Sequence, residues 1–492
     1  MRAARPAAAA LQHTGLPRGA EWLNNADPAA WAPGVAWGLD ATSLRTNAMH
    51  FLQHLWWRLG PPWTVWAWCA LAMAGVSLPV HAQDESVLKR ATALRAAPSD
   101  GAARVTELAQ SAAVTRTGKR QGAWLEVRTP SGATGWLHLF DVGASPREGA
   151  ATSGLRAVGG LVGGPSGPVG IATSTVGIRG LGEGDVARAT GGGRTAAANA
   201  DVLRQIDEAH TAADEAQAFA QAAALQVRAV EPLPAAAPGT VASAQRSATA
   251  ASLAGGSVPT DPGALLQSLD AITDAQETAL GRQMAAQLLA GRPMDPTPGL
   301  QRYVNQLGRW LSLQSARPGL PWSFVVIDES EFLAFSLPGG VVAVTRGLID
   351  RCADEAELAG LLAHEIAHVV HRHHLQALQR ALRGAGGTAT WAALTRHVYL
   401  VGTGAEAEHA ADREAVAIAA RAGLDPFGLV SALVQVNALG DSDLPYADAH
   451  PSSRLRLDEL ERAMAQRLDA WAGATAPVAI DQRLAAPVPR RR

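Results

Sequence analysis

The stretch HEIAHVVHRHH, residues 364 to 374, holds five histidines and one glutamate in eleven positions. His364 and His368 are four positions apart, so on a helix their rings lie on one face about one turn from each other. Two imidazoles placed in this way can bind one Zn²⁺ ion. Glu365 follows the first histidine. Its carboxylate can reach a zinc-bound water from there without itself binding the metal. The stretch therefore predicts a helix with a zinc site, although histidines also line solvated or packed helix faces.

A zinc site of this kind needs a third protein ligand and an open fourth position. His374 has the spacing of a third ligand in proteins whose chain turns back at a glycine, but His371 stands where that glycine is needed. If the helix continues, His374 lies about 9 Å along the axis from His368, at about 1.5 Å per residue. We therefore expect His371 to be structural or to support a ligand, and His373 and His374 to point away from the metal.

A second candidate for the third ligand lies downstream, in EAEHAADREAVAIAARAGLDP. Glu408 and Asp412 are four apart on a helix expected over residues 405–422, so they share one face. One carboxylate can complete the metal site, and the other can accept a hydrogen bond from a ligand histidine. These acids could also belong to a solvated charged helix, but the flanking alanines favour a packed face. We expect one Zn²⁺ ion per chain, bound by His364, His368 and Glu408.

Residues 265 to 472 resemble the zinc metallopeptidase family of the CaaX prenyl endopeptidases, HtpX and BepA. The resemblance rests on LGRQ, LPWSFVVID, AFSLPGGVVAVTRGLI, DEAELAGLLAHEIAHVVHRH, EHAAD, AARAGLDPFGL and HPSSRLRLDEL. It implies that Glu408 is the third ligand and that Asp412 is its partner around the metal. It also implies that His450 and Arg454 approach the site from the far side, where they steady the substrate or the oxyanion.

The expected fold class is α+β. A mostly helical, gluzincin-type metallopeptidase domain is expected over residues 263–474, with a small sheet that includes strands at 322–328 and 339–345. Asp354 is expected to cap the helix that carries the histidines, with Glu357 bonding back to it. The strand at 339–345 is expected to pair with an extended substrate.

Residues 84–144 read as short strands separated by turns, and they resemble a bacterial SH3-like domain. The matching motifs are LRAAPS, WLEVR and GWLHLFDV. The resemblance implies an all-β barrel whose ligand is a cell-wall peptide or another protein; the alternative is a spacer with packed tryptophans. Residues 145–262 are rich in glycine and alanine and are expected to be a linker, with a helix or a helical hairpin at 201–227. A disordered tail is expected over 475–492.

Residues 1–82 are expected to be an N-terminal extension and a signal peptide. An apolar, uncharged run from Trp63 to Leu78 is followed by small residues that end at Ala82, where cleavage is expected. The run is shorter than the roughly 20 residues that span a bilayer. Met49 is an alternative start. We therefore expect an exported protein, in the periplasm or cell envelope, whose mature chain has no transmembrane segment.

The net charge of -2 gives no sign of a nucleic-acid partner. The resemblance implies a zinc-dependent endopeptidase that hydrolyses unfolded or misassembled cell-envelope proteins, with Glu365 as the general base. His450 or Arg454 would stabilise the oxyanion, and His450 could instead keep the metal site latent. The alternatives are a zinc-dependent cell-wall peptide hydrolase and a non-catalytic chaperone or scaffold that binds clients.

Overall fold

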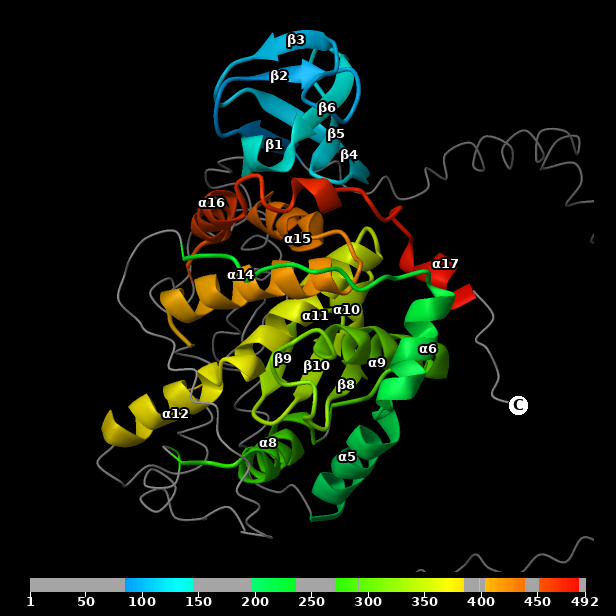
Figure 1. Cartoon of the computed structure of the whole chain (residues 1–492), viewed down its shortest axis with the longest axis vertical. Helices are drawn as coiled ribbons and strands as arrows, with labels where there is room; N and C mark the ends of the chain where they lie inside the picture. Colours follow the sequence, from blue (N-terminus) through cyan, green and yellow to red (C-terminus); the bar gives the residue numbers. More distant parts are fainter. Residues whose placement is uncertain are drawn as a thin grey trace, which may run out of the picture. The chain divides into compact units, whose positions relative to one another are not determined.

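A computed structural model (Figure 1) describes residues 85–144, 196–235, 269, 271–290, 292–384, 398, 403–438 and 451–485. The chain divides into a unit of Met1–Val80 and a unit of His81–Arg492, and every described residue lies in the second. The expected signal peptide falls outside the described residues. Within them, no helix has the length and apolar character needed to cross a membrane.

The first part of the second unit is a seven-stranded sheet in the order β3-β2-β6-β5-β4-β1-β7. Its strands are β1 (Glu85–Leu88), β2 (Thr92–Arg95), β3 (Arg104–Leu108), β4 (Ala113–Gln121), β5 (Trp124–Arg128), β6 (Thr134–His138) and β7 (Val142–Ala144). Every pairing is antiparallel. Side chains alternate between the two faces of a strand, which buries Leu125 and Val127 of β5 in a core with Leu94 and Leu137.

The second part contains a buried sheet of three strands, β8 (Ser323–Ile327), β9 (Ala334–Leu337) and β10 (Val341–Thr345). The order is β8-β10-β9, with β10 parallel to β8 and antiparallel to β9. The expectation that the strand at 339–345 pairs with a substrate is therefore wrong. Strand β10 is the central strand, and its backbone groups already bond to a neighbour on each side.

Helices surround this sheet, which confirms the α+β class. They are α8 (Asp274–Leu289), α9 (Pro298–Ser312), α10 (Arg346–Ile349), α11 (Glu355–Val370), α12 (His373–Gly384), α14 (Ala405–Arg421), α15 (Phe427–Ala438) and α16 (Ser453–Met464). Figure 1 shows α11, which carries the HEIAH stretch, between α14 and the sheet. Glycine lets α11 and α15 approach closely, because a Cβ at Gly428 would lie 2.0 Å from the Ala356 carbonyl oxygen.

Helix α11 begins where the sequence predicts. The carboxylate of Asp354 accepts a hydrogen bond from the Glu357 N–H at 3.0 Å. The Glu357 side chain bonds back one residue earlier than in a capping box, to the Ala353 N–H at 2.8 Å. The Glu357 carboxylate also accepts from Ser431 and Gln435 of α15, so this acid ties the two helices together.

In the described residues of the segment expected to be a linker, the structure has helices α5 (Ala196–Ala209) and α6 (Ala213–Ala222), where a helix or a helical hairpin is expected. They pack on the second part of the unit. Asp207 forms an ion pair with Arg282 at 2.6 Å, and Phe219 packs edge-on against Tyr303. Alanine-rich helices can fit closely against other helices. The composition of this segment did not reveal that its helices pack on the rest of the unit.

Of the tail expected to be disordered, residues 475–485 are described and are ordered. It contains α17 (Ile480–Ala485), from which Arg483 forms an ion pair with Glu355 at 2.6 Å. The Val478 carbonyl accepts a hydrogen bond from the Glu355 N–H. The first residue of α11 therefore holds this segment by both its backbone and its side chain.

The seven-stranded sheet contacts the second part of the unit through a buried arginine. Arg120, at the end of β4, has 4% of its side chain exposed and lies 2.6 Å from both Asp354 and Asp425. Asp354 caps α11, and Asp425 accepts a hydrogen bond from the Phe427 N–H at the start of α15. A further contact joins Lys89 to Asp458 of α16 at 2.5 Å. The barrel is thus attached to the start of the helix that carries the histidines.

Replacing Arg120 with methionine should lower the free energy of unfolding by about 3–5 kcal/mol, because two buried carboxylates lose their shared cation. Arg128→Met, on an exposed position of the same sheet, should change it by less than about 0.5 kcal/mol. Denaturant unfolding of both variants beside the parent measures the difference. Equal effects would contradict the proposed attachment.

Candidate metal centre

Three side chains from two helices converge in the interior. His364 and His368 come from α11 and Glu408 from α14, and they are 1%, 5% and 2% exposed. The two Nε2 atoms lie 3.0 Å apart. Each also lies 3.5 Å from a carboxylate oxygen of Glu408. The structure therefore brings together the three residues that the sequence predicts as ligands.

The donor set and its spacing fit a zinc ion. Tetrahedral zinc with bonds of roughly 2.0–2.1 Å holds its ligand atoms about 3.3 Å apart. The observed separations of 3.0 and 3.5 Å lie on either side of that value. Two imidazoles and one carboxylate are also the ligands of catalytic zinc sites that leave a fourth position open. Among the described residues, His364, His368 and Glu408 form the group of three side chains that could hold a metal ion.

Asp412 supports the first histidine, as its spacing from Glu408 predicts. Its Oδ1 atom lies 2.9 Å from His364 Nδ1. The guanidinium of Arg456 donates to both oxygens of Asp412, at 2.8 and 2.5 Å. Burial raises the pKa of the Asp412 carboxyl, but Arg456 and His364 outweigh burial and hold that pKa below its usual value. The orienting group is therefore an ionised acceptor.

The two ligand histidines differ in their affinity for protons. Burial and Arg456 oppose protonation of His364, but Asp412 and Glu408 raise its pKa to about 9. Burial lowers the pKa of His368 well below its ordinary value. A proton must leave His364 when its Nε2 atom binds a metal, so metal binding is expected to strengthen as the pH rises.

Glu365 lies close enough to His364 and Glu408 to interact electrostatically with both, and it is 4% exposed. The Ser336 hydroxyl, from β9, donates to its Oε2 atom at 2.7 Å. Burial raises the pKa of the Glu365 carboxyl, against the lowering effects of His364 and of the Ser336 hydrogen bond. A carboxylate that is fixed in orientation and more basic than usual is suited to accept a proton from water.

The structure does not bring Arg454 to the site. Its side chain is 64% exposed and lies 3.7 Å from Asp458. Arg456 takes the buried position instead, 3.9 Å from Glu408. Arg454 lies two residues before Arg456. Two residues turn a helix by about 200°, so the side chain of Arg454 points outward. The buried residues of α16 follow the helical repeat that includes 456 and omits 454: Ser453, Arg456, Leu457, Leu460, Ala463 and Met464. That repeat could have revealed the correct arginine. His450 lies outside the described residues.

The expectation that His373 turns away from the helix face that carries His368 is wrong, because it assumed a continuous helix. Helix α11 does not continue through the histidines but ends at Val370, and α12 begins at His373. Arg372 between them has a φ of 55°, which turns the chain without a glycine. As a result, His373 Nδ1 lies 3.1 Å from His368 Nδ1. His374 is also buried, 5.8 Å from the His368 ring between centroids.

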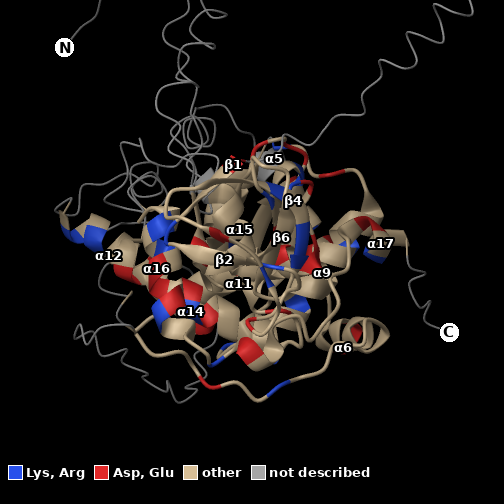
Figure 2. Cartoon of the chain, turned by 90° about the horizontal axis from the view of Figure 1, so that it is seen from above, with Lys and Arg blue, Asp and Glu red and all other residues tan. Residues whose placement is uncertain are grey.

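Contacts of charged and polar side chains, most of them largely buried, hold the helices of the site together. Figure 2 shows acidic and basic residues side by side on α14 and α16. Arg413 of α14 lies 3.3 Å from Glu459 of α16 and 3.3 Å from Glu406 on its own helix. Thr403, just before α14, donates to Glu408 at 2.8 Å. The third ligand therefore projects from a helix that is fixed at its start and along its outer face.

Replacing Arg456 with methionine should lower the free energy of unfolding by about 3–5 kcal/mol, because Asp412 loses its buried partner. Arg454→Met is the matched control and should change it by less than about 0.5 kcal/mol. Denaturant unfolding of the zinc-loaded protein tests both. A larger effect at Arg454 than at Arg456 would contradict this description of the site.

Comparison with known proteins agrees with the geometry. Residues 298–464 match the model of peptidase family M48, and residues 90–139 match that of the bacterial SH3 domain. The beta-barrel assembly-enhancing protease of Escherichia coli (strain K12) is 34% identical over 110 residues, 22% of this chain and 23% of that protein. The protease of that name from Yersinia pestis is 34% identical over 108 residues, 22% of each chain. The mitochondrial metalloendopeptidase OMA1 of Arabidopsis thaliana is 28% identical over 163 residues, 30% of this chain and 32% of that protein.

The chain spans less than a quarter of the length of the beta-barrel assembly-enhancing proteases that it matches. Residues 298–464, which match peptidase family M48, nevertheless contain all three converging ligands and Glu365. The expected resemblance is confirmed: the chain matches peptidase family M48 over residues 298–464 and the bacterial SH3 domain over residues 90–139.

Proposed function

We propose that the protein is a zinc-dependent endopeptidase that hydrolyses unfolded or misassembled proteins of the cell envelope. The observation that carries the proposal is the buried convergence of two histidine nitrogens and a glutamate carboxylate, with Glu365 next to His364 in the same helix. The names of the relatives, a protease that enhances β-barrel assembly and a metalloendopeptidase, support both the reaction and a role in protein quality control.

Zinc, when bound, supplies polarisation of the scissile carbonyl and lowers the pKa of the attacking water. Glu365 accepts the proton from that water and later delivers it to the leaving amine. The Ser336 hydrogen bond holds one oxygen of this carboxylate, which leaves the other to handle the proton. His450 remains the proposed oxyanion donor. Arg456 contributes a fixed positive charge behind the ligands.

The place of action is also part of the proposal. A signal peptide that is cleaved after Ala82 would export the chain to the periplasm or cell envelope, where misassembled envelope proteins are found. The SH3 domain would bind a cell-wall peptide or a protein there. Its attachment to the start of α11 through Arg120 supports a direct connection between the binding domain and the peptidase.

The test compares cleavage of unfolded casein by the parent and by Glu365→Gln, with zinc content measured in both. The amide keeps the size and the Ser336 contact but cannot accept a proton, so cleavage should fall by about 10²–10⁴-fold with zinc unchanged. Glu208→Gln, an exposed change on α5, should cleave as the parent does. Equal cleavage by the parent and Glu365→Gln would contradict the proposed base.

The same proteins separate the alternative functions. Release of muropeptides from purified cell walls by the parent, without cleavage of casein, would favour a cell-wall hydrolase. Zinc binding together with casein binding, but no hydrolysis of either material, would favour a chaperone or scaffold. His450→Ala would then show whether His450 keeps the site latent.

Metal removal should destabilise the fold, because zinc binds the native site and not the unfolded chain. Chelation should lower the melting temperature of the parent and of Glu365→Gln, and added zinc should restore it. Glu408→Ala should gain much less from zinc, since it lacks one of three ligands. Differential scanning calorimetry at a fixed zinc concentration measures this, and full zinc stabilisation of Glu408→Ala would contradict the assignment of the third ligand.

A further inference from the structure

A local turn interrupts the chain immediately after the helix that carries His364 and His368. Helix α11 ends at Val370, and Arg372 adopts the left-handed φ of 55° that residues other than glycine rarely take. Helix α12 starts at the next residue. This turn brings His373, 5% exposed, against the back of His368. His373 has no part in the ligand set or in the proposed proton transfers.

The contact between these two rings has one hydrogen-bonding arrangement that is compatible with metal binding. His368 Nδ1 and His373 Nδ1 lie 3.1 Å apart, so one must donate a proton and the other must accept it. His368 presents its Nε2 atom to His364 and Glu408. When Nε2 binds the metal, the ring proton of His368 is therefore on Nδ1, and His373 Nδ1 accepts the hydrogen bond. A neutral His373 must then carry its own proton on Nε2.

We propose that His373 is a positioning residue for the zinc ligand His368, an inference that rests on the proposed zinc site. Ligand histidines usually donate their second N–H to an acceptor that fixes the ring and increases its basicity. Asp412 has this role for His364, 2.9 Å from its Nδ1 atom. A second imidazole has the same role for His368. The two ligands of one helix are thus oriented by different chemical groups.

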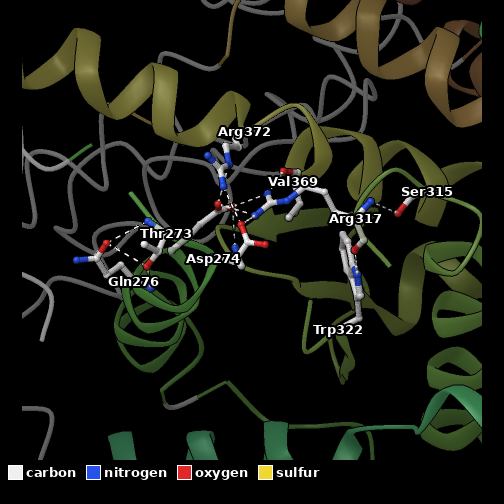
Figure 3. Close-up of polar contacts among 10 residues, drawn as sticks. Thr273, Asp274, Gln276, Ser315, Arg317, Trp322, Val369 and Arg372 are labelled. Atoms are coloured by element: carbon white, nitrogen blue, oxygen red, sulfur yellow. Dashed lines mark hydrogen bonds and ion pairs between the residues drawn. The ribbon is translucent and has the colours of Figure 1, made fainter. Parts of the chain in front are cut away.

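A charged cluster holds the turn that places His373 (Figure 3). Arg317 donates to the Val369 carbonyl at 2.9 Å, close to the end of α11. The same guanidinium lies 2.6 Å from Asp274 and 2.8 Å from Glu277, in the first turn of α8. Arg372 also pairs with these acids, at 2.8 and 2.9 Å. The left-handed residue is thus fixed by two ion pairs.

The cluster connects elements that are far apart in the sequence. Figure 3 shows Arg317 and Arg372 directed toward Asp274 from two different segments. Glu277 is fully buried and also accepts from the Gly339 N–H at 3.3 Å. Thr273 and Gln276 form a capping box that fixes the start of α8. The position of His373 therefore depends on side chains from α8 and from the loop before β8, and not only on its own helix.

Zinc affinity tests the proposal without depending on peptidase activity. The metal-free parent and its variants are titrated with zinc in competition with a chromophoric chelator. His373→Leu removes the acceptor and should weaken zinc binding by about 10–100-fold. His373→Asn places a carbonyl oxygen near the position of Nδ1 and should recover most of that loss. Glu208→Gln, the exposed control on α5, should bind zinc as the parent does.

An unchanged affinity in His373→Leu would overturn the proposal, and so would equal losses in His373→Leu and His373→Asn. A parent that binds zinc without cleaving protein, but shows the expected order of affinities, would contradict only the proposed function. The unmodified protein gives a second test, which does not depend on the folding of a variant. Long-range ¹H–¹⁵N NMR of the zinc-loaded protein should show protons on His368 Nδ1 and His373 Nε2. A proton on His373 Nδ1 would overturn the proposal.

Discussion

The site depends on the interactions of the buried Arg456 guanidinium with the carboxylates around it. Three acids lie in the same interior, Glu365, Glu408 and Asp412, and the side chain of Arg456 is 1% exposed among them. Buried carboxylates repel one another and cost several kcal/mol each unless a cation offsets them. Arg456 binds Asp412 with two hydrogen bonds and lies within 3.9 Å of Glu408. It allows the supporting acid to stay ionised, and so to orient His364.

The helix that carries the ligands is fixed at both ends. At its start, Asp354 caps the helix and pairs with Arg120 of the SH3 domain. At its end, Arg317 binds the Val369 carbonyl, and the following turn is held by ion pairs to α8. A ligand set must be held within a few tenths of an ångström to favour one metal geometry. The contacts at the two ends supply that restraint from segments far apart in the sequence.

The sequence predicted the parts of the site that follow a helical repeat. The four-residue spacing of His364 and His368, and of Glu408 and Asp412, placed each pair on one helix face, and the structure brings these faces together. Features that depend on single backbone angles were missed, since nothing in the residue types around Arg372 indicates a left-handed turn. The central position of β10 was missed for a similar reason: strand order depends on the whole chain and not on the strand itself.

The central claim is that His364, His368 and Glu408 bind one zinc ion. The most direct measurement is anomalous diffraction at the zinc absorption edge from crystals of the zinc-loaded protein. The account predicts a single strong peak at about 2 Å from the two Nε2 atoms and from the Glu408 carboxylate. A zinc peak at bonding distance from His373 or His374, or the absence of a peak between α11 and α14, would contradict it.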